Sequence, residues 1–285
     1  MRLLLTMTVM ALLTLPAAAQ WTITSENNLT LTQYAYSDNW AGGEAGALSW
    51  AATSNTVAEK QLSEMLNTRN TLRLEFGQTH NQDGETHSWA KPVNSTDKID
   101  FESVWRFTLG SLVDPFVSGR FESQFTDERD SDQTRYVNPM VLTESFGVAR
   151  MIIDEETRQW STRLGGALRQ HLDSGVLNAD TGEFESETTS DSGLEFVSEF
   201  TSPLAEDRLT MTSKFTTYQA LYYSESSDIE GDDWKSPDIE WENRLTAGIT
   251  DFLMVNLNLD AYYDKEIDDD PRFKQSLSLG FTWSI

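Results

Sequence analysis

Apolar and polar residues alternate along the last thirteen residues of the chain. Phe273, Leu277, Leu279 and Phe281 share one face, and lysine, serine, glycine and threonine occupy the positions between them. Successive side chains of a β-strand point to opposite faces of the sheet. The pattern therefore predicts a strand over residues 273–285 with one apolar and one polar face.

The same two-residue period recurs upstream and predicts twelve strands. Their ranges are 27–36, 44–56, 66–76, 98–109, 116–125, 139–153, 160–172, 192–200, 209–223, 239–249, 253–263 and 273–285. Soluble strands average roughly 5–6 residues, whereas a tilted membrane-spanning strand needs about 9–11. The longer ranges here favour membrane-spanning strands, and a soluble periplasmic β-sandwich with a binding role is kept as an alternative.

The connections between these strands alternate in length. The long ones are 37–43, 77–97, 126–138, 173–191, 224–238 and 264–272, and the short ones are 57–65, 110–115, 154–159, 201–208 and 250–252. Long outer loops and short periplasmic turns alternate in this way in outer-membrane barrels. We therefore expect an all-β, antiparallel, up-and-down transmembrane β-barrel of about 12 strands, formed by one domain over residues 20–285.

The first residues have the pattern of a secretory signal peptide. A basic start is followed by the apolar run 3–15, by Pro16 and by three alanines at 17–19. We expect residues 1–19 to be removed on export. Because the chain has no cysteine, a bacterial envelope is favoured over a eukaryotic extracellular space. The expected location is the outer membrane of a Gram-negative bacterium.

The charge balance is strongly acidic, with 21 Lys+Arg against 46 Asp+Glu and a net charge of −25. Such a chain lacks the basic surface that nucleic-acid binding requires. The long connections carry 25 of the acidic residues and 6 of the basic ones. We expect these acidic loops to bridge to lipopolysaccharide through divalent cations, or to attract cations to the mouth of the barrel.

Charged residues of both signs fall on the strand face that would line the lumen. They are Arg69, Arg73, Glu75, Asp100, Glu102, Arg106, Arg120, Glu122, Arg163, Arg169, Glu195, Glu199, Lys214, Glu240, Glu242 and Arg244. Such a face can form a charged polar channel, or a paired network that fills a narrow barrel. The sequence therefore predicts either a narrow channel for small polar or cationic solutes or a structural envelope protein.

A lipid hydrolase of the outer membrane is the enzymatic alternative, and we favour a non-enzymatic protein. His171 is the one histidine within an expected strand and has the parity of the lumen face. His80 and His87 lie in a long connection with Asp83 and Glu85, but their spacing fits no standard metal motif. We therefore assign no catalytic residue, metal ligand or cofactor.

The first expected hairpin carries Gln33, then Asn39 and Trp40, then Gly42 and Gly43. This order resembles an uncharacterised family of outer-membrane barrel proteins, a domain of unknown function with an Asn-Trp-x-x-Gly-Gly signature. Later stretches are similar in order: Asp97 to Asp100, Gly119 to Phe125, and Asn138-Pro139. The resemblance implies a barrel in the outer membrane and brings no activity, so the motif residues have no assigned role.

The C-terminal strand also has the alternating apolar pattern that barrel-assembly machinery reads. The usual terminal aromatic residue is replaced here by Ile285. We expect the assembly machinery and the outer-membrane lipids to be partners of the chain.

Overall fold

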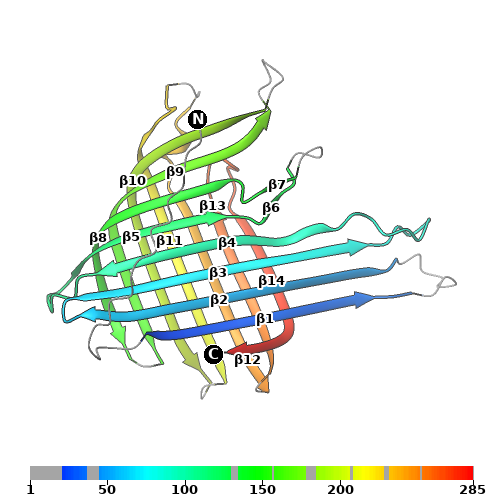
Figure 1. The fold of residues 1–285 in the computed structure, drawn as a ribbon, viewed down its shortest axis with the longest axis horizontal. Helices are drawn as coiled ribbons and strands as arrows, with labels where there is room; N and C mark the ends of the chain where they lie inside the picture. The colour runs from blue at the N-terminus through cyan, green and yellow to red at the C-terminus, as the bar shows by residue number, and fades with distance from the viewer. Residues whose placement is uncertain are drawn as a thin grey trace, which may run out of the picture.

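The computed structural model describes residues 21–36, 45–129, 134–155, 157–177, 184–205, 208–227, 231–250 and 252–284. In this part of the chain a closed antiparallel barrel forms (Figure 1). Its twelve strands are β1 (Thr22–Tyr34), β2 (Ala47–Ser63), β3 (Leu66–Asn81), β4 (Val93–Arg106), β5 (Asp114–Ser123), β8 (Met140–Asp154), β9 (Gln159–Leu177), β10 (Phe184–Leu204), β11 (Leu209–Tyr223), β12 (Asp238–Thr250), β13 (Leu253–Tyr263) and β14 (Arg272–Ser284).

Two small elements lie in the connections. A hairpin of β6 (Thr126–Asp127) and β7 (Arg135–Tyr136) lies between β5 and β8, and the short helix η1 (Asp233–Lys235) precedes β12. No helix among the described residues is long and apolar enough to cross a membrane.

The barrel closes by pairing its first strand with its last. Leu29 of β1 lies opposite Phe281 of β14, and every other barrel strand pairs with the barrel strands before and after it in the chain. This order is the up-and-down topology that the alternating pattern predicts. The prediction of an all-β antiparallel barrel of about twelve strands is confirmed.

Several strands continue into ranges that the hydrophobic pattern assigns to connections. β9 runs to Leu177 and β10 starts at Phe184, so most of the segment 173–191 extends a β-hairpin. β3 and β4 likewise extend to Asn81 and from Val93. Polar residues predominate on both faces of these extensions, so the two-residue hydrophobic period fades although the backbone pairing continues.

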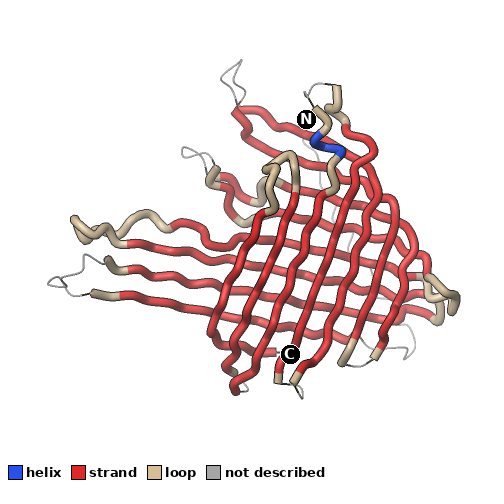
Figure 2. The backbone as a smooth tube through the Cα atoms, turned by 180° about the vertical axis from the view of Figure 1, so that it is seen from behind, coloured by secondary structure: helices blue, strands red, loops and turns tan. Residues whose placement is uncertain are grey.

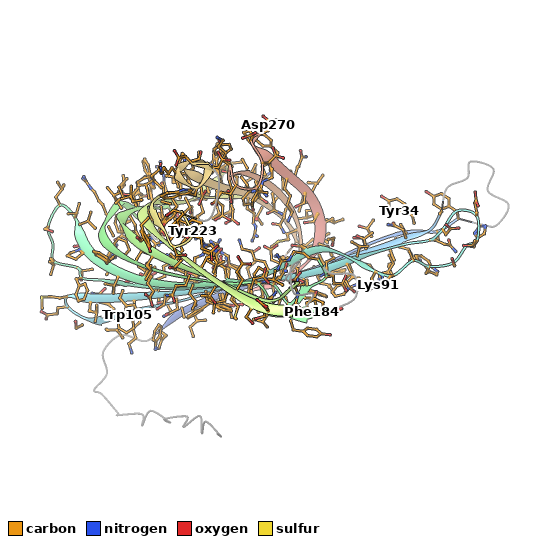
Figure 3. The ribbon with its side chains drawn as sticks, turned by 90° about the horizontal axis from the view of Figure 1, so that it is seen from above. Tyr34, Lys91, Trp105, Phe184, Tyr223 and Asp270 are labelled. Atoms are coloured by element: carbon orange, nitrogen blue, oxygen red, sulfur yellow. The ribbon has the colours of Figure 1, made fainter. Side chains whose placement is uncertain are left out.

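The strands form two crossing walls. In Figure 1, β1 to β4 run across the view, and the steeper strands β11 to β14 lie behind them. Figure 2 shows the steep wall from its own side. From above, β1 to β4 continue beyond the ring, and Tyr34 and Lys91 lie on this extension (Figure 3). The lumen lies between the two walls.

Glycines allow close approach of the backbones from β8 to β11. A Cβ atom at Gly193 would lie 2.0 Å from the carbonyl oxygen of Gln219, and one at Gly147 would lie 2.2 Å from that of Leu164. Gly147 also lies directly opposite Gly165. Only a residue without a Cβ fits this spacing without backbone movement.

The outward face of the ring is apolar. Phe273, Leu277 and Leu279 of β14 are 80%, 71% and 57% exposed, whereas Gly280 on the inward side is buried. Apolar side chains exposed on all sides of a closed barrel are what a lipid environment requires. The period-2 pattern therefore separates an outer apolar face from a polar lumen.

Three outward-facing tryptophans have partners for their indole N–H groups. Trp105, Trp160 and Trp241 each donate to a serine hydroxyl at 3.0 Å. Unpaired donors are costly in hydrocarbon. Each of these residues therefore presents an apolar ring outward without leaving its N–H unpaired.

Candidate functional site

A band of charged side chains crosses the lumen partway along the strands, and we call it the charge belt. Its members are Arg73, Lys98, Asp100, Glu102, Arg120, Arg163, Lys214, Glu240 and Glu242. All but Lys98 are among the lumen charges that the sequence analysis names, and Lys98 has the same strand parity as Asp100.

Glu242 connects the two walls. Its carboxylate oxygens accept from Arg73 Nη1 at 3.0 Å and from Lys98 Nζ at 2.9 Å. Arg73 and Lys98 lie on β3 and β4, whereas Glu242 lies on β12, which pairs with β11 and β13. These ion pairs therefore cross the lumen.

Glu102 of β4 is the second junction. It pairs with Arg163 of β9 at 2.6 Å and with Lys214 of β11 at 3.5 Å. The side chains of both bases are only 7% exposed. Charges with so little access to water need opposite partners, so Glu102 serves as a shared partner for two bases from other strands, and Glu199 lies 3.9 Å from Lys214 as well.

Arg120 of β5 is the third junction. Its guanidinium donates to both carboxylate oxygens of Asp100, at 3.1 and 2.9 Å, and lies 2.8 Å from Glu122. It also lies 3.8 Å from Glu240 of β12. Bidentate pairing with a carboxylate fixes the guanidinium plane. The belt therefore ties opposite walls together at three places.

Amides and hydroxyls occupy the lumen between the belt and the short turns. Thr246 donates to the Asn256 side chain at 2.7 Å, and Asn258 donates to Ser276 at 3.0 Å. Asn28 of β1 is also buried and donates to Thr53 at 3.4 Å. Charged side chains join this network as well, since Arg244 donates to Asn258 at 3.0 Å and Arg69 lies 3.6 Å from Glu59.

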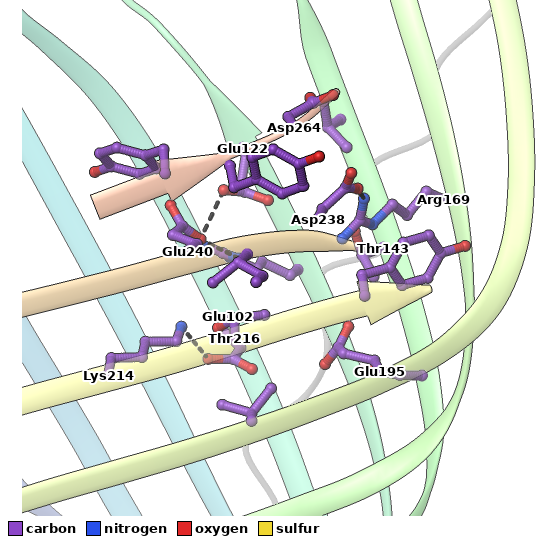
Figure 4. A pocket seen from close by; sticks show the side chains of 18 of the residues that line it. Glu102, Glu122, Thr143, Arg169, Glu195, Lys214, Thr216, Asp238, Glu240 and Asp264 are labelled. Atoms are coloured by element: carbon purple, nitrogen blue, oxygen red, sulfur yellow. Dashed lines mark hydrogen bonds and ion pairs between the residues drawn. The ribbon is translucent and has the colours of Figure 1, made fainter. Parts of the chain in front are cut away.

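A cavity of about 230 Å³ opens beside the belt toward the long connections, and we call it the outer cavity (Figure 4). Its wall combines carboxylates and tyrosines with two valines and with four basic side chains, Arg120, Arg169, Lys214 and Arg272. Residues used below are Glu195, Thr216, Tyr218, Asp238, Val141 and Val197. Among the described residues, no base or hydrogen-bond donor pairs with the Glu195 carboxylate, and the buried Thr216 hydroxyl has no partner.

A second cavity of about 400 Å³ continues from it, and we call it the vestibule. The two share Val141, Arg169, His171, Tyr218, Asp238 and Asp264. The vestibule adds Glu187, Tyr223, Trp234 and Glu266 from the strand extensions and long connections. Burial raises the pKa of Glu266, and the charges of Asp264, Asp238 and Asp191 raise it further. Negative charge is therefore in excess here.

One cluster on the shared wall is fully paired. Arg169 donates to Asp238 at 2.7 Å, and its guanidinium lies 3.5 Å from the centre of the Tyr218 ring. The Tyr218 hydroxyl donates to Asp191, which also contacts His171 Nε2 at 2.9 Å. Stacking and ion pairing together hold Arg169 in place.

His171 lines both cavities inside the ring, as its parity predicts. Within the described part of the chain its side-chain partner is Asp191, and no serine hydroxyl contacts the imidazole. A lipid hydrolase needs a nucleophile within hydrogen-bond reach of its base. The geometry around His171 therefore gives no support to the hydrolase alternative.

The hairpin motif is only partly described. Gln33 lies on β1 opposite Leu48 and is exposed. Asn39, Trp40, Gly42 and Gly43 lie outside the described residues, as do residues 1–20 of the expected signal peptide. The structure brings Gln33 to neither cavity, and the motif keeps no assigned role.

The long connection between β5 and β8 is held by two polar anchors that the sequence did not assign. The first is Asp97 of β4, which accepts from the backbone N–H of Phe125 at 2.5 Å and of Thr126 at 3.0 Å. Asn94 donates to Asp97 at 3.0 Å and to the Thr126 hydroxyl at 2.7 Å. The connection thus starts against β4.

The second anchor is the buried Asp127. It accepts from Arg129 and Asn138 at 2.9 Å and pairs with Arg135 at 2.8 Å. The Arg129 hydrogen bond holds the pKa of Asp127 well below its usual range. Asn138 also donates to Asp173 on β9 at 2.8 Å. The connection is therefore fixed to the extended β9–β10 hairpin.

Comparison with known proteins gives one family and several barrels. A protein family of unknown function, DUF3078, matches residues 31–128, from β1 to β6. A search of curated proteins gives no match.

The solved structures include outer-membrane barrels. The COG4313 outer membrane channel from Pseudomonas putida F1 is 11% identical, with 95% of this chain and 97% of that chain covered and a TM-score of 0.45. The translocator domain of autotransporter NalP from Neisseria meningitidis is 10% identical, with 93% and 88% covered and a TM-score of 0.37. The NanC porin is also 10% identical, with 90% and 98% covered and a TM-score of 0.36.

Proposed function

We propose that the chain is an outer-membrane β-barrel that forms a narrow channel selective for small cations. The apolar outward face and the closed ring of strands support the membrane location. A closed barrel satisfies every backbone group internally, which is a condition for spanning hydrocarbon.

The observation that carries the selectivity is the unbalanced charge of the outer cavity and vestibule. Glu195 has no paired base among the described residues, and Glu266 lies among further carboxylates. The two cavities are lined by ten Asp and Glu side chains and four Arg and Lys side chains. An excess of one charge sign at a lumen entrance raises the local concentration of oppositely charged solutes. Cations would collect there before they meet the charge belt.

The charge belt would act as the constriction. Its pairs join β3, β4 and β5 to β12, and β4 to β9 and β11. Passage then requires solutes that fit between paired side chains, or pairs that exchange partners as a cation passes.

Ion selectivity in planar bilayers tests this function. In a salt gradient, the reversal potential of the purified barrel should have the sign of cation flow. Glu195→Gln should reduce the selectivity, whereas Glu64→Gln, a matched loss of charge at the exposed turn between β2 and β3, should leave it unchanged. Anion selectivity in the unmodified barrel would contradict the proposal.

A structural envelope barrel is the second candidate, and the belt is the observation that favours it. Bases that are 7% exposed and ion-paired resemble a filled interior more than an open pore. The structural candidate would be favoured over the channel if correctly folded barrels carried no current. The Leu279→Arg and Ser278→Arg comparison described in the Discussion shows whether the barrel is correctly folded.

A further inference from the structure

The inner end of the outer cavity contains a buried hydroxyl group that has no hydrogen-bond partner among the described residues. Thr216 is 7% exposed and lines the cavity, and its hydroxyl has no partner in the described part of the chain. Buried polar groups without partners are rare because each costs free energy. Glu195 lines the same cavity, so an acceptor carboxylate and an unpaired hydroxyl face one space.

The outer end of the continuous space is aromatic and acidic. The Tyr223 and Trp234 rings lie with centroids 6.2 Å apart, and both line the vestibule. Asp264 and Glu266 line it as well, and burial together with neighbouring carboxylates raises the pKa of Glu266. Aromatic faces and carboxylates are the two surfaces that attract an organic ammonium group.

Three of the four Arg and Lys side chains that line these cavities are already engaged: Arg169 pairs with Asp238, Arg120 pairs with Asp100 and Glu122, and Lys214 pairs with Glu102. The fourth, Arg272, has no ion pair among the described residues. An anionic guest would compete with the chain's own carboxylates at the first three bases, and at Arg272 it would meet the excess of carboxylates that line the two cavities. A cationic guest would instead meet the unpaired Glu195 at one end and the acidic vestibule at the other.

The spacing of the carboxylates argues against a bound metal ion. Among the described residues no three His, Asp or Glu side chains are grouped closely enough to hold one. Between the acidic ends the shared wall includes Val141 and the ring of Tyr218, and Val197 lines the inner part. Separated carboxylates with an apolar stretch between them match an extended molecule with charged ends.

We propose that the outer cavity and vestibule together bind a linear aliphatic diamine. One ammonium group donates to Glu195 and Thr216, and the other lies between Asp264, Glu266 and the aromatic rings. The methylene chain then follows Val141 and Tyr218. This inference rests on the proposed cation channel, because the diamine would be its solute, but binding can be measured without any current.

Isothermal titration of the full barrel in detergent tests the site. The probes are 1,4-diaminobutane and butylamine, at about 150 mM salt, where interactions beyond roughly 8 Å are screened. We expect the diamine to bind at least about tenfold more tightly than the monoamine, since it gains a second charge-assisted contact. Equal affinities, or no heat from either amine, would overturn the proposal.

Three variants locate the contact. Glu195→Gln should weaken diamine binding by about tenfold and remove its advantage over butylamine. Asp264→Asn should weaken diamine binding by a similar factor. Because Asp264 lies in a connection outside the barrel wall, this variant tests the site even if Glu195→Gln does not fold. Glu64→Gln keeps the site and should not change the affinity. Equal weakening by Glu64→Gln would mean that net charge alone attracts the amine, which contradicts a site.

The outcomes separate the two proposals. Diamine binding without cation current would leave the site standing and reject the channel. Cation current without selective diamine binding would leave the channel standing and reject the site.

Discussion

The charge belt and the outer cavity are neighbouring parts of one lumen, yet they hold charge differently. In the belt, Glu102 lies between two bases that are 7% exposed. In the cavity, Glu195 forms no ion pair in the described structure, although its charge acts on the nearby Arg163. Paired charges that bridge walls serve the shape of the barrel, whereas an unpaired carboxylate facing open space is available to a solute.

The largest expected effect comes from breaking a junction of the belt. Glu102→Leu leaves Arg163 and Lys214 buried without their main partner, which should cost about 3–5 kcal/mol of unfolding free energy. Urea unfolding of the lipid-folded barrel, followed by tryptophan fluorescence, measures this.

Glu195→Gln is the matched change in the cavity. It should alter the unfolding free energy by no more than about 0.5 kcal/mol, because no paired charge is lost. Similar losses for Glu102→Leu and Glu195→Gln would show that belt and cavity do not differ as described.

The next largest effect concerns the wall that encloses both regions. Leu279 points outward and is 57% exposed, whereas Ser278 is half-buried on the lumen side. Leu279→Arg should cost about 2–4 kcal/mol near the bilayer centre, whereas lumen positions tolerate charge better. Heat-modifiable migration on detergent gels reports the folded yield of each variant. Equal yields for Leu279→Arg and Ser278→Arg would remove the lipid-facing assignment of β14.

A smaller effect is expected at Asp127, whose ion pairs lie in the connection between β5 and β8, outside the barrel wall. The Arg129 hydrogen bond holds the pKa of Asp127 below its unfolded value, which is about 3.9. A depressed folded pKa gives stabilisation that is present above the unfolded pKa and is lost as pH falls toward the folded pKa. Hydrogen exchange of residues 124–129, corrected for intrinsic rates, should therefore show steady protection at neutral pH and its loss in strong acid.

Asp127→Asn supplies the control for this pH dependence. The variant keeps the shape of the side chain but loses the charge that Arg129 and Arg135 pair with. Its protection at neutral pH should already be low and should change little with acid. A wild-type loss of protection that the Asn variant shares unchanged would assign the effect to another group.

The strands could be predicted because lipid on one side and a polar lumen on the other impose a strict two-residue period. β14 and β13 follow it closely, and their observed bounds differ little from the predicted ones. The period fades where both faces meet water, which is why Glu185 and Glu187 fell in a predicted loop although they belong to β10.

For the site, the sequence predicted which charged residues face the lumen, but it did not predict which of them pair. Parity placed Arg73, Glu102 and Glu242 in the lumen, but their pairing depends on which strands lie opposite after closure. β4 and β12 are far apart in the chain and are not hydrogen-bonded neighbours, so no local pattern links Lys98 to Glu242. The buried Asp127 anchor was missed for the same reason, since its partner Asn138 comes from beyond the hairpin.

Single-channel conductance of the unmodified barrel beside Arg73→Ala/Glu242→Ala tests the central claim most directly. The double variant removes both ion pairs that Glu242 makes across the lumen and keeps the net charge, and Lys98 retains Asp100 at 3.8 Å. The account predicts a small cation-selective conductance in the unmodified barrel and a conductance at least about twofold larger, still cation-selective, in the variant. Equal conductances in the two proteins, or current carried mainly by anions, would contradict it.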